Sequence, residues 1–313
     1  MGELHFRAMG SDVHVVVVGG PSHLADAARV RINELEQRWS RFLPDSEVSE
    51  LTRRAGTPMT VSDETVELIS LAIDAWHMTG STFDPTVLGA VIRAGYDESF
   101  EHLSPRSADG LSDLIIGCTD ITIDGNVVTL PAGTGFDPGG IGKGLAADLV
   151  SAQMIAAGAD GVCVNMGGDL RVRGDAPEGA GWTIAIEHAW SSRPIANVGI
   201  TQGAIATSTT LRRRWSINGV ERHHLIDPRT GEPARTDLNL VSVIAGSAWE
   251  AEVLAKAVLI RGSAHPFDLL DGAGAHALLV DDDGIVTVSD GFREFLGFGW
   301  LPERIERDEK SAG

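Results

Sequence analysis

The sequence has few cysteines, few basic residues relative to acidic ones, and no long apolar run. Only two of the 313 residues are cysteines, Cys118 and Cys163, and they show neither CxxC spacing nor a paired-histidine metal pattern. The cysteine spacing therefore indicates neither a metal site nor a disulfide framework. A reducing compartment is the simplest interpretation of two such cysteines.

Acidic residues outnumber basic ones by 44 to 25, so the formal net charge is −19. This charge argues against nucleic acid and against an anionic membrane surface as partners. A phosphate ligand would need local donors that hold it against the overall field. Since no apolar stretch reaches membrane length and residues 1–7 lack a basic region followed by an apolar one, we expect cytoplasmic residence without membrane insertion.

Hydrophobic periodicity predicts more strands than helices. The expected strands are 13–18, 121–123, 127–130, 161–165, 182–187, 196–200, 213–217, 222–226, 240–244, 276–280 and 285–288, and the expected helices are 22–38, 62–80, 145–157 and 247–259. Because short turns join many neighbouring strands, we expect an α+β fold with mixed, largely antiparallel sheets and flanking helices. Two lobes in one compact unit, residues 1–303, would precede a disordered tail, residues 304–313.

The stretch 135–148 contains glycines at 139, 140, 142 and 144, with Lys143 among them, before an Ala- and Leu-rich helix. Glycine admits positive φ and close backbone approach, and a helix N-terminus with a lysine suits an anion. The P-loop spacing is not met, and Pro138 is a poor end for the strand that a dinucleotide fingerprint requires. Two interpretations of this stretch stay open: a binding site for a diphosphate, and a helix-capping turn that binds no ligand.

Four other polar groups lie at strand ends or on a helix, where sites are often built. They are the Gly-Gly turn at 165–169, the hydroxyl run at 206–210, the segment 223–231, and Glu250, Glu252 and Lys256. Each group can also be explained without a functional role. In the same order, the four would be a hairpin bend, a solvated strand, a structural histidine and an exposed Glu252–Lys256 ion pair. In a strand over 222–226, His223 and His224 would face opposite sides, so one can serve in acid–base chemistry while the other does not.

Taken together and in order, these motifs resemble the FAD:protein FMN transferases, the ApbE-like flavin transferases. The resemblance runs through MGS at 9–11, SRF at 40–42, TGSTFDPT at 79–86, DPGGIGKG at 137–144, NMGGD at 165–169, ATS at 206–208 and HLIDPRTG at 224–231. It implies an ApbE-like or T-fold-like domain that binds FAD and Mg²⁺. The implied reaction joins FMN from FAD to a Ser or Thr hydroxyl of an acceptor protein and releases AMP.

The resemblance also implies roles for individual residues. His224 would be the catalytic base, with Asp227 close by. Contacts with FAD are implied for Met9, Thr86, Asp137, Gly139, Gly140, Lys143, Gly167, Gly168, Asp169 and Ser208. The implied metal site comprises the Gly142 carbonyl and positions 252 and 256 of the late helix.

At those two helix positions the family has Asp and Thr, whereas this chain has Glu252 and Lys256. A glutamate can still ligate Mg²⁺ through oxygen, but a protonated lysine cannot. Two alternatives to the transferase therefore stay open. One is an FAD-binding or flavin-carrier protein with a degenerate metal site, and the other is an FAD pyrophosphatase that yields FMN and AMP.

Overall fold

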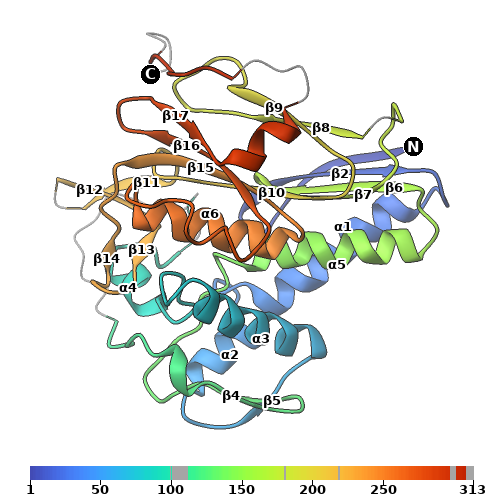
Figure 1. The fold of residues 1–313 in the computed structure, drawn as a ribbon. Helices are drawn as coiled ribbons and strands as arrows, with labels where there is room; N and C mark the ends of the chain where they lie inside the picture. Colours follow the sequence, from blue (N-terminus) through green and yellow to red (C-terminus); the bar gives the residue numbers. More distant parts are fainter. Residues whose placement is uncertain (99, 101–111, 180, 218, 297–300, 308–313) are drawn as a thin grey trace. The chain divides into compact units, whose positions relative to one another are not determined.

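In a computed structural model (Figure 1) the chain divides into two compact units. Unit 1 comprises Met1–Ile32, Lys143–Leu211 and Thr236–Gly313, and unit 2 comprises Asn33–Gly142 and Arg212–Arg235. The structure describes all residues except 99, 101–111, 180, 218, 297–300 and 308–313.

Unit 1 is built on an eight-stranded sheet whose neighbouring strands all pair antiparallel. In sheet order the strands are β1 (Gly2–Ala8), β2 (Ser11–Val18), β6 (Gly161–Met166), β7 (Asp169–Gly174), β10 (Gly203–Thr209), β15 (Leu238–Ala245), β16 (His276–Asp281) and β17 (Val286–Val288). This sheet confirms the predicted largely antiparallel α+β class.

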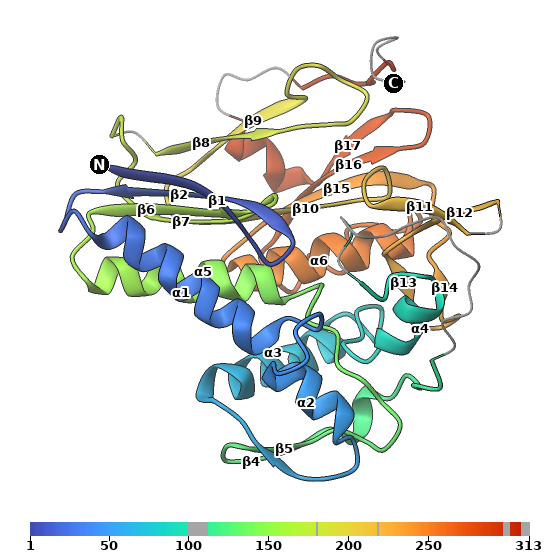
Figure 2. The same cartoon turned by 180° about the vertical axis from the view of Figure 1, so that it is seen from behind.

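Different elements cover the two faces of this sheet, as Figure 2 shows from behind. Helices α5 (Gly142–Ala156) and α6 (Ala248–Arg261) lie on one face. The hairpin of β8 (Trp182–Ile186) and β9 (Ala196–Ile200), with the 3-10 helix η3 (Asp290–Phe295), lies on the other. Buried apolar side chains from the sheet and from the hairpin, including Val16, Trp182 and Phe292, form one core cluster on the hairpin-covered face.

Unit 2 holds short helices and small sheets. Its elements are α2 (Glu47–Arg53), β3 (Met59–Thr60), α3 (Asp63–Met78), α4 (Leu88–Arg93), η2 (Cys118–Asp120), β4 (Thr122–Asp124), β5 (Val127–Thr129), β11 (Arg214–Ile217), β12 (Val220–His223), β13 (Ile226–Asp227) and β14 (Glu232–Pro233), and α1 (Leu24–Trp39) continues into it from unit 1. The Ser62 side chain accepts the Thr65 amide at the start of α3, and Gly80, with φ of 57°, follows its end. The predicted start and stop of this helix are thus confirmed.

The predicted elements did not include strands β1, β3, β7, β10 and β14, helices α2 and α4, or the 3-10 helices η2 and η3. Burial alternates along β1 because Leu4 and Phe6 alternate with polar residues. The sequence does contain this period-2 signal, which is typical of a strand. Helices α2 and α4 have only seven and six residues, too short for helical periodicity to stand out.

Two predicted segments are corrected by the structure. The strand expected over 222–226 is interrupted after His223, because the Leu225 amide turns back to donate to His223 Nδ1 over 3.3 Å. Residues 304–307 are not a free tail: Ile305 is buried and its amide donates to the Gly284 carbonyl over 2.8 Å. Residues 308–313 lie outside the described residues.

Within the described part of the chain, no helix has the length and apolarity needed to span a membrane.

Candidate functional site

A buried charge cluster in unit 1 joins three of the residues singled out from the sequence. Lys143 Nζ donates to Asp169 and, over 2.9 Å, to Glu252 Oε1. The two carboxylate side chains are only 6% and 4% exposed, and the lysine side chain is 17% exposed. One ammonium between two carboxylates leaves a formal charge of −1. The Lys143 ammonium, expected to face a diphosphate, is thus paired with two of the protein's own carboxylates.

Helices α5 and α6 cap each other's N-termini beside this cluster. Glu252 Oε2, on α6, accepts the Gly144 amide of α5 over 2.8 Å. Asp148 Oδ2, on α5, accepts the first amides of α6 from Ala248 and Trp249 over 2.8 and 3.0 Å. Carboxylates at helix N-termini satisfy free N–H groups and favour the helix dipole. Part of the predicted anion seat is thus occupied by the protein's own Glu252.

Burial of the Asp148 carboxylate disfavours its charged form more than its hydrogen bonds and neighbouring positive charge favour it. Arg171 Nε lies 3.2 Å from its Oδ1 without hydrogen-bond alignment. Burial raises the pKa of Asp148 to about 6, although the amides of α6 and the charge of Arg171 act in the opposite direction. This carboxylate therefore titrates in the weakly acidic range.

The glycine loop does not use positive φ. Among the described glycines, positive values occur at Gly167 and Gly168 but not at 139, 140, 142 or 144. A Cβ on Gly144 would lie 2.4 Å from the Ala248 carbonyl oxygen of α6. Close approach of two helices, rather than a left-handed turn, is what requires glycine at position 144.

The part of the glycine loop in unit 2 is held by Asp137. Its Oδ1 accepts the Gly139 amide over 2.9 Å, and its own amide donates to the Pro85 carbonyl over 2.7 Å. Arg41 Nε lies 3.6 Å from Asp137 Oδ1, and its guanidinium stacks on Phe42. Arg41 entered the sequence argument only through the SRF motif, and the structure makes it a support of this loop.

Two tight turns lie next to each other at one end of the unit 1 sheet. The β1–β2 turn places Met9 at φ 49°, a left-handed conformation uncommon outside glycine, and the β6–β7 turn contains Gly167 and Gly168. The Gly167 amide donates to the Asp12 carbonyl over 2.9 Å, and a Cβ on Gly167 would lie 2.7 Å from Ser11. The structure thus brings three predicted FAD-contact residues together.

Strand register separates the hydroxyls of β10 by face. Ser208 pairs with Val241, and alternation places it on the helix-covered face together with Asp169. Thr207 lies on the opposite face, where its hydroxyl hydrogen-bonds Ser242 over 2.7 Å. Ser208 is therefore the member of the predicted hydroxyl run that shares a face with the charge cluster.

Thr86 is fully buried among protein partners in unit 2. Its amide and hydroxyl donate to Asp84 Oδ1 over 2.7 and 2.5 Å, and its hydroxyl accepts the Gly117 amide over 2.8 Å. These bonds make Thr86 an organiser of its loop. The predicted direct contact between Thr86 and FAD gains no support from this geometry.

The two adjacent histidines of unit 2 have different surroundings. His223 Nε2 donates to the Ala234 carbonyl over 3.1 Å, while Nδ1 accepts the Leu225 amide. Burial lowers the pKa of His223, although its hydrogen bond to Ala234 acts in the opposite direction. His224 lies half-buried in the segment between β12 and β13. His223 is thus the structural histidine that the sequence argument allowed for, which leaves His224 as the candidate for proton transfer.

Asp227, the other predicted catalytic residue, is held by Arg229. The Arg229 amide, Nε and a terminal NH₂ donate to its two carboxylate oxygens over 3.0, 3.1 and 2.9 Å. Burial would raise the pKa of Asp227, but the hydrogen bonds and charge of Arg229 outweigh it, so that pKa lies below its ordinary value. Asp227 is therefore ionised and a weak base near neutrality.

The predicted magnesium residues do not form a suitable donor set. Both carboxylate oxygens of Glu252 already accept hydrogen bonds, from Lys143 and Gly144. Lys256, one turn further along α6, cannot ligate a cation while protonated. Among the described residues, the one group of three or more His, Cys, Asp or Glu side chains with suitably close ligand atoms is Glu3, His5 and His14. That group was not predicted from the sequence, because β1, which carries Glu3 and His5, was not predicted.

A model of the ApbE family matches residues 9–279. The chain belongs to the ApbE family. Relatives over nearly the whole chain agree: the FAD:protein FMN transferase of Vibrio cholerae is 27% identical over 94% of this chain and 90% of its own length. The FAD:protein FMN transferase of Treponema pallidum is 28% identical over 79% of this chain and 74% of its own length.

Solved structures support the ApbE assignment at the level of fold. The ApbE protein of Thermotoga maritima superposes with a TM-score of 0.83 at 27% identity, covering 94% of this chain and 99% of that one. The apo flavinyl transferase ApbE of Pseudomonas stutzeri gives 0.80 at 25% identity, with 95% and 96% covered. Every site residue predicted from the sequence lies within the stretch matched by the ApbE model.

Proposed function

We infer that this chain is an FAD:protein FMN transferase, which moves FMN from FAD to a Ser or Thr hydroxyl of an acceptor protein and releases AMP. The observation that carries this inference is the family match over residues 9–279, together with relatives bearing that name whose alignments cover 94% and 79% of this chain. These names favour the transferase over the flavin-carrier and pyrophosphatase alternatives.

We propose His224 as the base of the reaction. The acceptor hydroxyl oxygen would form a bond to the FMN phosphorus of FAD, the bond from that phosphorus to the bridging oxygen would break, and AMP would leave with that oxygen. The hydroxyl proton would pass to the imidazole of His224, whose ordinary pKa lies near neutrality. Asp227 is held ionised by Arg229 and has a lowered pKa, so it is the weaker base of the two.

The proposed FAD contacts in unit 1 are Met9, Gly167, Gly168, Asp169, Lys143 and Ser208. Their support is geometric: the Met9 and Gly167–Gly168 turns adjoin, and Ser208 shares a sheet face with Asp169. The proposed contacts in unit 2 are Asp137, Gly139, Gly140 and Thr86, with Thr86 acting through its loop. We further propose that residues 1–303 form a single catalytic domain.

Magnesium dependence is a separate question, because the donor set at 252 and 256 does not fit the ion. We expect transfer to respond little to added Mg²⁺ in the natural chain. A Glu252→Asp, Lys256→Thr variant would restore the donors that the family resemblance implies and should respond more strongly. We also propose cytoplasmic residence, for which the two buried free cysteines give the support.

The experiment supplies purified protein with FAD and an acceptor protein that carries phosphoester-linked FMN in its mature form. In-gel flavin fluorescence and intact-mass analysis measure FMN on the acceptor, and chromatography measures AMP. We expect equal amounts of acceptor-bound FMN and AMP. AMP with free FMN would instead identify a pyrophosphatase, and FAD that binds without cleavage would identify a carrier. Parallel reactions in Mg²⁺ and in a chelator report on the metal alone.

A further inference from the structure

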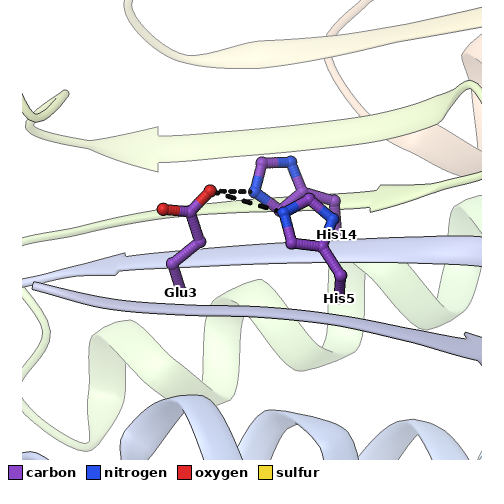
Figure 3. A group of neighbouring side chains, drawn as sticks. All are labelled: Glu3, His5 and His14. Atoms are coloured by element: carbon purple, nitrogen blue, oxygen red, sulfur yellow. Dashed lines mark hydrogen bonds and ion pairs between the residues drawn. The ribbon is translucent and has the colours of Figure 1, made fainter.

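Three metal-binding side chains meet on the edge hairpin of unit 1 (Figure 3). Glu3 and His5 are two residues apart on β1 and therefore share a face of the strand. His14, on β2, is the direct cross-strand partner of His5. Strand alternation and pairing register thus fix which side chains meet, without any contribution from loops.

The ligand atoms lie close enough together to reach one small cation. Glu3 Oε1 lies 2.8 Å from His14 Nε2 and 3.5 Å from His5 Nε2, and the ligand atoms of the three residues all lie within 4.8 Å of one another. Around a tetrahedral ion with bonds of about 2.0–2.1 Å, ligand atoms lie about 3.3 Å apart. The imidazole rings stack nearly parallel with their centroids 4.0 Å apart, and Nε2 of each ring lies near the same carboxylate oxygen.

The donor chemistry selects the class of ion. Two imidazole nitrogens with one carboxylate oxygen suit Zn²⁺ and its divalent transition-metal neighbours, whereas Mg²⁺ and Ca²⁺ prefer oxygen ligands throughout. The side chains of Glu3, His5 and His14 are 46%, 70% and 34% exposed, so an ion there would keep a position open to water. The next cross-strand pair on this face, Arg7 with Asp12, is an ion pair of 2.9 Å that adds no formal charge.

We propose that Glu3, His5 and His14 form a binding site for a divalent transition-metal ion of the zinc class. The site is distinct from the flavin-transfer residues, and Glu3 and His5 precede the stretch matched by the ApbE model. Because His14 and His5 come from different strands, a bound ion would cross-link β1, the edge strand of the sheet, to β2. Binding would thereby stabilise the hairpin against opening.

The test is a titration of chelator-stripped protein with Zn²⁺, followed by calorimetry, and with Co²⁺, followed by its visible absorption bands. We expect one Zn²⁺ per chain and an intense tetrahedral Co²⁺ spectrum. His5→Ala and His14→Ala should each weaken binding by at least about tenfold and remove that spectrum. Glu3→Gln, which changes one exposed side chain without shortening it, should do the same if the carboxylate is a ligand.

The matched control is His23→Ala, since His23 is an exposed histidine of the same unit outside the cluster. This variant should bind Zn²⁺ and Co²⁺ as the natural chain does. The proposal is overturned if the natural chain takes up no ion, or if His14→Ala and Glu3→Gln bind as tightly as it does. Circular dichroism of each variant distinguishes loss of ligands from loss of fold.

Discussion

The candidate residues of the two units are held in different ways. In unit 1, Lys143, Asp169 and Glu252 lie on helices and at a strand end, are buried, and use one another as partners. In unit 2, His224 lies half-buried between two short strands. A buried charge that loses its partner is expensive, whereas a proton acceptor needs access and a suitable pKa. Substitutions should therefore affect mainly stability in the Lys143–Asp169–Glu252 cluster and mainly rate at His224.

The largest effect is expected for His224→Ala. Removal of a general base typically lowers a rate by about 10²–10⁴-fold. We expect FMN transfer to fall by such a factor, while FAD affinity, measured by fluorescence titration, and the melting temperature change little. A drop in stability equal to that of a buried-charge variant of unit 1 would erase the contrast between the units.

The neighbouring histidine is the control for this prediction. His223→Ala removes an acceptor of the Leu225 amide and a donor to the Ala234 carbonyl. Leaving such buried groups unpaired costs about 1–3 kcal/mol of folding free energy. We expect His223→Ala to lower stability and to leave the transfer rate per folded molecule within a few-fold of the natural rate. The opposite result would exchange the roles of the two histidines.

The next largest effect is expected in unit 1 for Lys143→Met, which leaves Asp169 and Glu252 buried without their shared cation. Breaking a buried ion pair on one side costs about 3–5 kcal/mol. Urea unfolding should show a loss of this order. Adding Glu252→Gln should recover part of it, because the second change removes one of the two uncompensated charges. A double variant no more stable than Lys143→Met would show that the cluster does not act as a unit.

A third prediction concerns pH and Asp148. Its pKa is about 6 in the folded protein against 3.8 ordinarily, so between these values the folded state binds more protons than the unfolded state. Stability should therefore fall as pH rises from about 4 to about 6, by about 3 kcal/mol if Asp148 acts alone. Asp148→Asn should flatten the curve of unfolding free energy in this window. An unchanged curve would assign the dependence to other groups.

The contrast between the units also explains what the sequence could predict. Long periodic segments, such as the helix that begins after Ser62 and the strand within β2, were predicted to within a few residues, because burial on one face dictates their pattern. Helices α2 and α4 were missed because six or seven residues carry too little periodicity. The strand over 222–226 failed because a histidine side chain, rather than the backbone ladder, takes the Leu225 amide.

At the site, the sequence identified residue types but not their partners. It singled out Lys143, Asp169 and Glu252 separately, yet their ion pairs join positions up to 109 residues apart, which no local pattern reveals. The mutual capping of α5 and α6 by Asp148 and Glu252 was invisible for the same reason. The pairing of His14 with His5 could have been found, because alternation along residues 2–8 predicts β1 and a short turn fixes the register.

The smallest effect is expected where packing alone is tested, at Gly144. A Cβ there would lie 2.4 Å from the Ala248 carbonyl oxygen, and since that atom is backbone, α6 itself would have to move away from α5. Overpacking of this kind costs about 1–3 kcal/mol, so Gly144→Ala should lower the melting temperature and weaken the Glu252–Gly144 cap. Gly142→Ala is the control, because its Cβ would come no closer than 3.4 Å, to the Pro138 side chain. If both substitutions prove equally harmless, the helices are not held by this contact, and glycine at 144 must instead serve a ligand that approaches the loop.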